Sequence, residues 1–279
     1  MNKRWHAPIK LVVLIGVVVA LPTASLAQGQ VQVRVIMSGG FSAAFRELQP
    51  EFEKTTGIKL TVTRGASQGV GPDTIGAQLH VGVPEDVVIM SREGLDELIA
   101  EGWIVAGTDV DLGQSPLGMS VRAGAPKPDI STAEAFKRTM LRAKSVTFPS
   151  STTGIYLVTK LFPQLGIAKE MAAKTTSTGV AAVAKGDAEI AVQPVSELLR
   201  AAGVDFVGTI PTEIQYVSVF SAAMVNDLKQ PKAVLAARAQ GAKELIAFLA
   251  SEKARTAIQK SGMEVLATRG AGRTGSRGN

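Results

Sequence analysis

The 279-residue sequence contains no cysteine and two histidines, which removes most thiol and metal chemistry. Disulfides are excluded, and a zinc site built from histidine and cysteine cannot be assembled, so we expect no bound metal. His6 lies in a leader-like segment, which leaves His80 as the histidine available to a Ser-His-Asp triad. His80 falls in a predicted helix far from any Gly-x-Ser-x-Gly turn, so we interpret it as a surface residue.

The net charge of +6 comes from the two ends of the chain. Residues 1–27 and 267–279 each contain three basic side chains and no acid. Residues 28–266 hold equal numbers of basic and acidic side chains. The basic character therefore gives no indication of a nucleic-acid partner.

The first 27 residues have the pattern of a secretory signal peptide. Lys3 and Arg4 precede an apolar run over 9–21, and Ser25-Leu26-Ala27 places small residues at the cleavage site. The apolar run is shorter than the roughly 20 residues that a membrane span needs. We expect cleavage after Ala27 and a periplasmic protein, whose Gly- and Arg-rich residues 267–279 form a disordered tail.

Strand, turn and helix patterns alternate along the chain. A β-branched strand over 31–37 is followed by a glycine turn and a helix over 41–55, and further strands are predicted over 58–63 and 86–90. This alternation predicts an α/β fold with mostly parallel sheets covered by helices on both faces.

Two long extended stretches, 112–121 and 216–225, interrupt the alternation. We interpret them as hinge crossings between two lobes. The first lobe is predicted to contain residues 28–115 and 213–266, and the second lobe residues 116–212.

Three strand-to-helix turns are rich in glycine and hydroxyl residues: 38–40, 65–69 and 150–154. In an open parallel sheet such turns lie at the carboxyl edge, where ligands bind. Each turn also opens a helix whose first N–H groups are free to bind an anion. The three turns together predict an anion site between the lobes.

Acidic pairs offer the alternative of a secreted enzyme that uses carboxylates of the cleft. Glu85, Asp86 and Asp187 are candidates for acid–base work, whereas Asp109 and Asp111 fall in a turn and are interpreted as solvated acids. No nucleophile is partnered by a base in the sequence. We therefore expect a binding protein without enzymatic activity or cofactor.

The motifs resemble the periplasmic molybdate-binding proteins, which are two-lobed receptors of ABC importers with the type II periplasmic binding fold. The resemblance spans about residues 30–265. It rests on the Ser-Gly-Gly turn at 38–40, the Thr-Gly-Ile of 56–58, Gly-Ala-Ser at 65–67, the Gly-x-Pro-x-Asp-Val-Val-Ile of 82–89 and Thr-Gly-Ile-Tyr at 153–156.

The resemblance assigns oxyanion-binding roles to residues of the first lobe. Ser67 matches the second serine of the family's site. The first serine falls on Gly40, so Ser38 or the N–H groups of Gly39 and Gly40 would have to replace it.

In the second lobe, the resemblance makes Thr153 a backbone donor and Thr176 a second donor. The family's tyrosine has no counterpart, and Gln193 is expected to face the cleft in its neighbourhood. A larger anion, such as a small organic acid, would use an added guanidinium, for which Arg64 is a candidate.

The resemblance implies the solute-binding protein of an ABC importer that captures a molybdate-like oxyanion. A small organic carboxylate is the alternative ligand. The expected partners are the small anion and an inner-membrane ABC permease, and the protein is expected to be a monomer.

Overall fold

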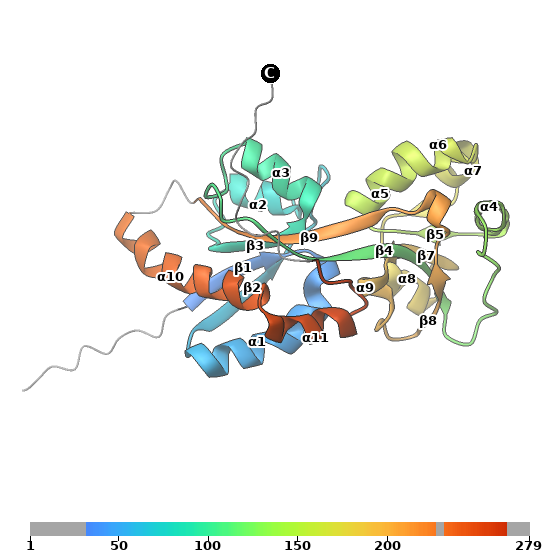
Figure 1. Ribbon diagram of the computed structural model, residues 1–279. Helices are drawn as coiled ribbons and strands as arrows, with labels where there is room; N and C mark the ends of the chain where they lie inside the picture. Colours follow the sequence, from blue (N-terminus) through green and yellow to red (C-terminus); the bar gives the residue numbers. More distant parts are fainter. Residues whose placement is uncertain (1–31, 227–231, 267–279) are drawn as a thin grey trace, which may run out of the picture.

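The computed structural model describes residues 32–226 and 232–266 (Figure 1). The predicted signal peptide and the predicted tail lie outside these residues. Among the described helices, none combines the length and the hydrophobicity of a membrane-spanning segment.

Within the described residues, nine strands form one continuous sheet in the order β2-β1-β3-β9-β4-β7-β5-β6, with β8 paired to β4. The strands are β1 (Gln32–Met37), β2 (Lys59–Arg64), β3 (Val87–Ser91), β4 (Val110–Arg122), β5 (Val146–Thr147), β6 (Thr175–Thr176), β7 (Ile190–Pro194), β8 (Val204–Thr209) and β9 (Val217–Met224). Strands β1, β2 and β3 are parallel to one another, as are β5, β6 and β7. The pairs of β9 with β3 and β4, and of β4 with β7 and β8, are antiparallel.

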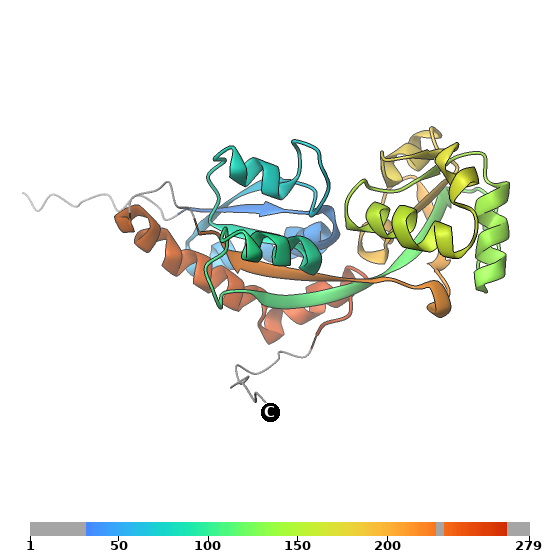
Figure 2. The ribbon, with the colours of Figure 1, turned by 90° about the horizontal axis from the view of Figure 1, so that it is seen from above.

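The predicted sheet is therefore mixed rather than mostly parallel, because two crossing strands run through it in opposite directions. The first half of β4, 110–116, pairs with β9, and the second half, 117–121, pairs with β7. Figure 2 shows β4 and β9 running side by side from one lobe to the other. The two lobes share these strands as a hinge.

Helices cover both faces of the sheet. The first lobe holds η1 (Gly39–Phe41), α1 (Ser42–Thr56), α2 (Ile75–His80), α3 (Arg92–Ala100), α10 (Lys232–Leu249) and α11 (Glu252–Lys260). The second lobe holds α4 (Ala133–Arg142), α5 (Thr152–Tyr156), η2 (Leu157–Leu161), α6 (Phe162–Gln164), α7 (Ala168–Ala172), α8 (Val180–Lys185) and α9 (Val195–Leu198), and η3 (Thr212–Ile214) lies in the return connection.

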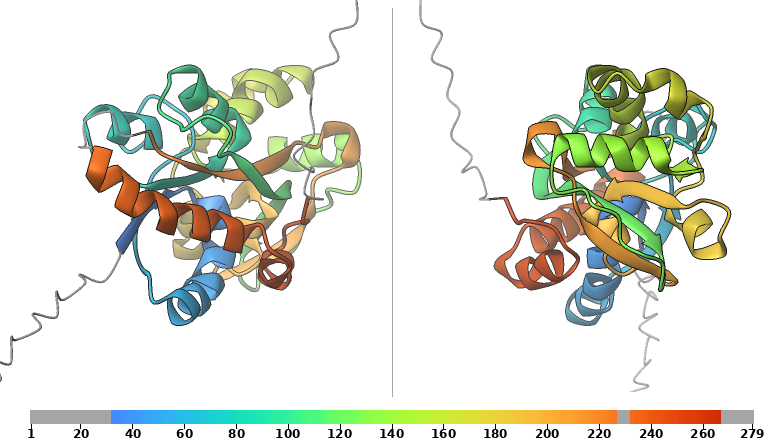
Figure 3. Two further views of the ribbon diagram at one scale, coloured as in Figure 1. Left: turned by 60° about the vertical axis from the view of Figure 1, so that its left-hand side comes forward. Right: turned by 90° about the vertical axis from the view of Figure 1, so that its right-hand side faces the viewer.

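The alternation of β1 divides the first lobe into two apolar layers. Val33, Val35 and Met37 pack with residues of α1, α10 and α11. Ile36 points to the other face and packs with α2 and α3. The left view of Figure 3 shows α1 and α10 on the same side of the sheet. Burying both faces of the sheet accounts for its run of β-branched residues.

The second lobe also has a core on each face of its sheet. Residues of α4, η2, α6 and α7 pack with β4, β5 and β7 in one core, and residues of α8 and α9 form the other. The sequence patterns missed α4 and β8. The start of α4 is fixed by Thr132, whose Oγ1 accepts a hydrogen bond from the Ala135 N–H at 3.1 Å.

Candidate functional site

A cavity of about 170 Å³ lies between the lobes, where strand-to-helix turns of both lobes meet. Its wall residues are Ser38, Gly39, Ala66, Ser67, Ser91, Pro149, Ser151, Thr152, Thr153, Pro194, Glu197, Ser218 and Phe220. These residues follow the carboxyl ends of β1, β2, β3, β5 and β7 or lie on β9. The volume is below the roughly 300–1,000 Å³ of pockets for drug-sized molecules, which favours a small ligand.

Two serines give the first lobe its hydrogen-bonding groups in the cavity. Ser38 is 6% exposed, and its Oγ has no hydrogen-bond partner within the described residues. Ser67 is 5% exposed, and its Oγ accepts a hydrogen bond from the Ser91 N–H at 2.9 Å. Because that bond uses only the oxygen of Ser67, its hydroxyl proton stays available to a ligand. An unpaired buried hydroxyl is costly unless a ligand satisfies it.

The second lobe contacts the first lobe beside these serines through direct hydrogen bonds to Ser91 and Gln68. Thr152 Oγ1 lies 2.8 Å from Ser91 Oγ, and the Gln68 N–H donates to Ser151 Oγ at 3.3 Å. Thr153 is buried beside Thr152 at the start of α5. Contacts between residues more than sixty positions apart in the chain thus join the two lobes beside the cavity, which stays partly open to solvent.

Glu197 is the carboxylic acid on the cavity wall. It is half-buried in the first turn of α9, and burial raises the pKa of its carboxyl from the ordinary 4.5 to about 7. It faces the first-lobe turn, since a Cβ on Gly39 would lie 3.2 Å from its Oε1. Glycine at position 39 thus leaves room for a carboxyl group that is present in both protonation states near neutral pH.

Gln193 lies behind Glu197 rather than on the cavity wall. Its Nε2 donates to Glu197 Oε2, and its Oε1 accepts a hydrogen bond from the Val180 N–H. The bond to Glu197 lowers the pKa of that carboxyl and opposes the larger effect of burial. Both ends of the Gln193 amide are used within the protein, so it positions the acid.

Three further residues that were expected in the site, Gly40, Thr176 and Arg64, do not line the cavity. Gly40 is buried against Phe220, where a Cβ would come within 1.9 Å of Cζ, so packing requires glycine there. Thr176 is exposed, and its Oγ1 lies 3.3 Å from Thr178 Oγ1, outside the cavity wall. Arg64 is exposed at the end of β2, with Nη1 against Ser42 Oγ.

The acids proposed for the enzyme alternative lie away from the cavity. Glu85 and Asp86 precede the amino end of β3, and Asp187 precedes the amino end of β7. Asp86 pairs with Arg34 at 3.2 Å, and Thr63 donates to Glu85 at 2.6 Å. The cavity acid is Glu197, which the sequence patterns missed because an acid in the first turn of a helix is ordinary on dipole grounds.

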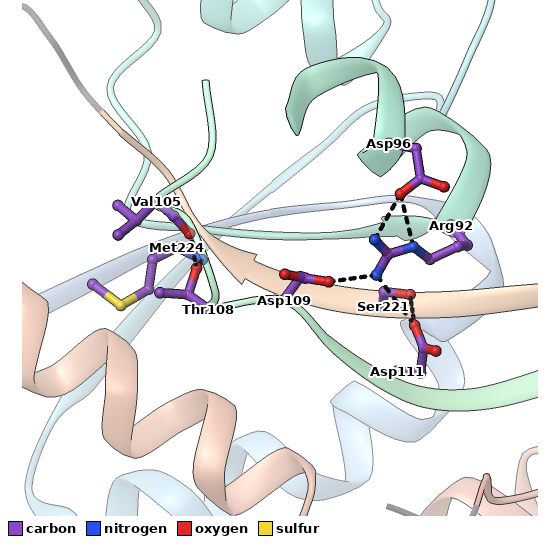
Figure 4. A network of polar contacts seen from close by, with 8 residues as sticks. All are labelled: Arg92, Asp96, Val105, Thr108, Asp109, Asp111, Ser221 and Met224. Carbon is purple, nitrogen blue, oxygen red and sulfur yellow. Dashed lines mark hydrogen bonds and ion pairs between the residues drawn. The ribbon is translucent and has the colours of Figure 1, made fainter. Parts of the chain in front are cut away.

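Asp109 and Asp111 are ion-paired rather than freely solvated (Figure 4). Arg92 Nη1 lies 2.8 Å from Asp109 Oδ2 and 3.4 Å from Asp111 Oδ1, and Arg92 Nη2 lies 2.6 Å from Asp96. Burial lowers the pKa of Arg92, but the hydrogen bonds that Arg92 donates to Asp96 and Asp109 outweigh this effect and raise the pKa. Arg92 thus ties α3 to β4 and holds its charge away from the cavity.

Tyr216 joins the hinge to the first lobe. Its hydroxyl donates to Glu93 Oε1, and its ring stacks on Tyr156 with the centroids 4.8 Å apart. Burial and Glu93 raise the pKa of Tyr216, so the phenol stays neutral. These contacts bring α3, α5 and the return crossing together.

A larger cavity of about 670 Å³ lies at the opposite end of the second lobe, near the amino ends of β5 and β7. Arg122, Arg138 and Arg142 are among its wall residues. Ligands of open α/β sheets bind at the carboxyl edge, so we assign the functional site to the smaller cavity between the lobes.

The mixed sheet, the two crossing strands and the cavity between the lobes define the two-lobed type II periplasmic binding fold. The periplasmic molybdate-binding protein of Azotobacter vinelandii has a similar structure, with a TM-score of 0.65 and 18% identity over 84% of this chain and all of that one. The L-phospholactate-bound Peb3 structure matches with a TM-score of 0.59 and 13% identity over 84% of this chain and all of that one. The protein named in that structure comes from Campylobacter jejuni. These similarities confirm the predicted fold class.

The chain belongs to the bacterial extracellular solute-binding protein family, whose model matches residues 33–264. Membership confirms the coarser expectation of a bacterial extracellular solute-binding protein, whereas it does not confirm the resemblance to the molybdate-binding proteins in particular.

A relative from Pseudomonas sp. is 40% identical over 242 residues, which cover 85% of this chain and 89% of the relative, and it is named aconitate isomerase. Our expectation that the chain is not an enzyme is wrong, because this relative is an enzyme. A low content of histidine and cysteine does not exclude an enzyme, since a single carboxyl group is enough for proton transfer.

Proposed function

We propose that the protein binds aconitate or a closely similar small polycarboxylate between its lobes and isomerises it. The observation that carries the proposal is Glu197, a cavity carboxyl whose pKa is raised to about 7. The 40% identity to an aconitate isomerase supports the substrate class. The predicted ABC permease remains a separate proposal that rests on the fold.

The same carboxyl group argues against a molybdate-like oxyanion as the ligand. When Glu197 is ionised, its charge opposes a tetrahedral dianion enclosed in the same cavity. An organic acid places a carbon chain between its charged groups, so a C–H bond can face Glu197 while the carboxylates contact the serines. The carboxylate ligand, first treated as the alternative, is therefore the better proposal.

Aconitate can be isomerised by moving one proton along an allylic system. The Glu197 carboxylate takes a proton from the methylene carbon, and the C–H electron pair forms a new double bond to the central carbon. The electrons of the former double bond then form a new C–H bond at the far carbon with the proton that Glu197 returns. The connectivity and the sum of atoms are unchanged, while the geometry of the new double bond depends on the rotation of the chain before proton removal.

The cavity supplies the groups that this proton shift needs. Negative charge spreads onto a substrate carboxylate as the methylene proton leaves, and hydroxyl donors from Ser38 and Ser67 can stabilise it. A base whose pKa lies near the working pH suits both removal and return of the proton. The contact between Thr152 and Ser91 covers one side of the cavity and so limits the access of bulk water to that proton.

The direct test is incubation of the protein with trans-aconitate, followed by NMR, beside thermal-shift measurements with trans-aconitate and with molybdate. We expect cis-aconitate to form without an added cofactor, and trans-aconitate to raise the melting temperature. Stabilisation by trans-aconitate without turnover would make the protein a carboxylate receptor and overturn the catalytic part. Stabilisation by molybdate alone would overturn the proposed substrate class.

Ser38→Ala is expected to weaken binding of trans-aconitate by about 0.5–1.5 kcal/mol without loss of stability. The Ser38 hydroxyl has no partner among the described residues, so its removal breaks no internal bond. Calorimetric titration and thermal melting measure the two effects. Ser120→Ala is the matched control, since Ser120 Oγ is also buried without a partner but lies outside the cavity wall. Equal affinity of the Ser38 and Ser120 variants would remove Ser38 from the site.

Gln193→Met is expected to move the acidic limb of the kcat/KM profile to higher pH. The substitution removes the donor that lowers the pKa of Glu197, so that pKa rises above about 7 and less base is present at neutral pH. A pH–rate profile measures the shift. Gln114→Met is the control, because Gln114 donates to Glu264 at 2.8 Å in a similar Gln–Glu pair outside the cavity wall. An unmoved limb would show that Gln193 does not act through Glu197.

A further inference from the structure

Two arginines of the first lobe differ from the other arginines of that lobe because they have no carboxylate partner among the described residues. Arg46 is exposed on α1, and Arg64 is exposed at the end of β2. Neither takes part in any ion pair of the described residues, whereas Arg34, Arg92 and Arg255 each pair with carboxylates.

Arg46 and Arg64 also lie near one another, because Arg64 Nη1 contacts Ser42 Oγ and Arg46 follows Ser42 by one turn of α1. Burial lowers the pKa of Arg64, and the charge of Arg46 lowers it further. The adjacent acid, Glu47, faces other cations, with Arg200 at 3.7 Å and Lys260 at 3.6 Å. Two like charges held together on a neutral protein body favour an anion between them.

Local geometry connects this pair to the cavity. Arg64 pairs in register with Met37, the residue before Ser38. Its Nη1 contacts Ser42 Oγ, and Ser42 donates to the Ser38 carbonyl at 3.2 Å. Ser42 and Arg46 are four residues apart on α1 and therefore share a face of the helix. The guanidinium of Arg64 is thus two contacts away from a residue of the cavity wall.

We propose that Arg46 and Arg64, with Ser42 between them, form a carboxylate-binding subsite beside the cavity. This inference rests on the proposed function and deepens it: one carboxylate of a tricarboxylic acid binds the arginines while the reacting carbons lie at Glu197. Arginine suits this role because its planar guanidinium binds a carboxylate through two parallel hydrogen bonds. The subsite would select tricarboxylates over dicarboxylates.

The test uses three acids and the full chain. Trans-aconitate carries three carboxylates. Glutaconate lacks the carboxylate on the central carbon, and mesaconate lacks the carboxylate on the methylene arm. Their dissociation constants are measured by calorimetry for the unsubstituted protein, Arg46→Gln, Arg64→Gln and the double variant. Arg138→Gln on α4 is the control for the loss of one positive charge, since Arg138 lies 3.9 Å from Glu134 in the second lobe. Circular dichroism melts verify that each variant is folded.

We expect the double variant to bind trans-aconitate at least tenfold more weakly, and the dicarboxylate that lacks the anchored group to change less than threefold. The control should match the unsubstituted protein. Unchanged affinity of the double variant for trans-aconitate, or an equal loss for all three acids, would overturn the subsite and leave the proposed function intact. If the unsubstituted protein binds none of the acids, the proposed function itself fails, and the subsite fails with it.

Discussion

Glu197→Gln is expected to slow aconitate isomerisation by roughly 100- to 10,000-fold while trans-aconitate still binds. Glutamine keeps the shape of the side chain and can still contact Gln193, but it cannot take a proton from the methylene carbon. NMR assays of turnover and calorimetry of binding separate the two effects. Glu134→Gln, an exposed acid on α4, is the control and should retain full activity. Turnover at the unsubstituted rate in the Glu197 variant would remove Glu197 from the mechanism.

The stability of the same variant should depend on pH in a defined direction. Because the pKa of Glu197 is raised from 4.5 to about 7, the folded state holds the proton more tightly than the unfolded chain. The contribution of Glu197 to the free energy of unfolding of the unsubstituted protein therefore falls as the pH rises from about 4.5 through 7. Glu197→Gln should raise the free energy of unfolding by on the order of 1–3 kcal/mol at pH 8, and change it little at pH 4.

The pH dependence of the free energy of unfolding distinguishes loss of the reactive carboxyl group from misfolding of the variant. An inactive variant that melts at a higher temperature than the parent at pH 8 is folded and lacks only the acid. A variant that melts lower at both pH values would instead assign Glu197 a structural role. Denaturant unfolding at the two pH values provides the measurement.

Gly94→Ala is expected to cost on the order of 3 kcal/mol of stability and to abolish tight binding of trans-aconitate. A Cβ at position 94 would lie 2.2 Å from the Ser67 carbonyl oxygen and 2.8 Å from Met90 Cε. The closer neighbour is backbone, so α3 or the Ser67 turn must move. That movement also displaces the Ser67 hydroxyl, which accepts from the Ser91 N–H. Thermal melting and calorimetry measure both losses.

Gly76→Ala is the matched control for this substitution. Gly76 lies in α2, and a Cβ there would come no closer than 3.6 Å to the Leu98 side chain. Alanine in a helix is favoured over glycine by about 0.5–1 kcal/mol, so this variant should be slightly more stable. If Gly94→Ala behaved like Gly76→Ala, the close packing of α3 on the Ser67 turn would be refuted.

One titratable side chain changes what a cavity lined by hydroxyl groups can do. The molybdate-binding protein of Azotobacter vinelandii shares the fold at 18% identity, and that likeness carries no information about the ligand of this chain. In this chain Glu197 places a titratable group among hydroxyl and backbone donors. Hydroxyl donors alone suit an anion receptor, whereas hydroxyl donors beside a carboxyl with a pKa near 7 also suit proton transfer.

Much of the fold follows from local patterns in the sequence. The strand, turn and helix over 31–55 correspond to β1, η1 and α1, and the extended stretches 112–121 and 216–225 correspond to β4 and β9. Helix α4 and strand β8 were not predicted, although Thr132, which caps the start of α4, is a local signal for that helix. The mixture of parallel and antiparallel strands could not be predicted from local patterns, because β9 pairs with β3 and β4, and β3 is distant from β9 in the sequence.

The sequence by itself determined that glycine and hydroxyl turns at the ends of strands would meet at one edge. This follows from the period of strands and the position of turns, which are local properties, and it places Ser38, Ser67 and Thr153 on the wall of one cavity. Only the tertiary structure decided that Glu197 joins them, that Gln193 stands behind it and that Thr176 lies outside. The burial that raises the pKa of Glu197 depends on how the two lobes pack, and no local pattern of residues encodes that packing.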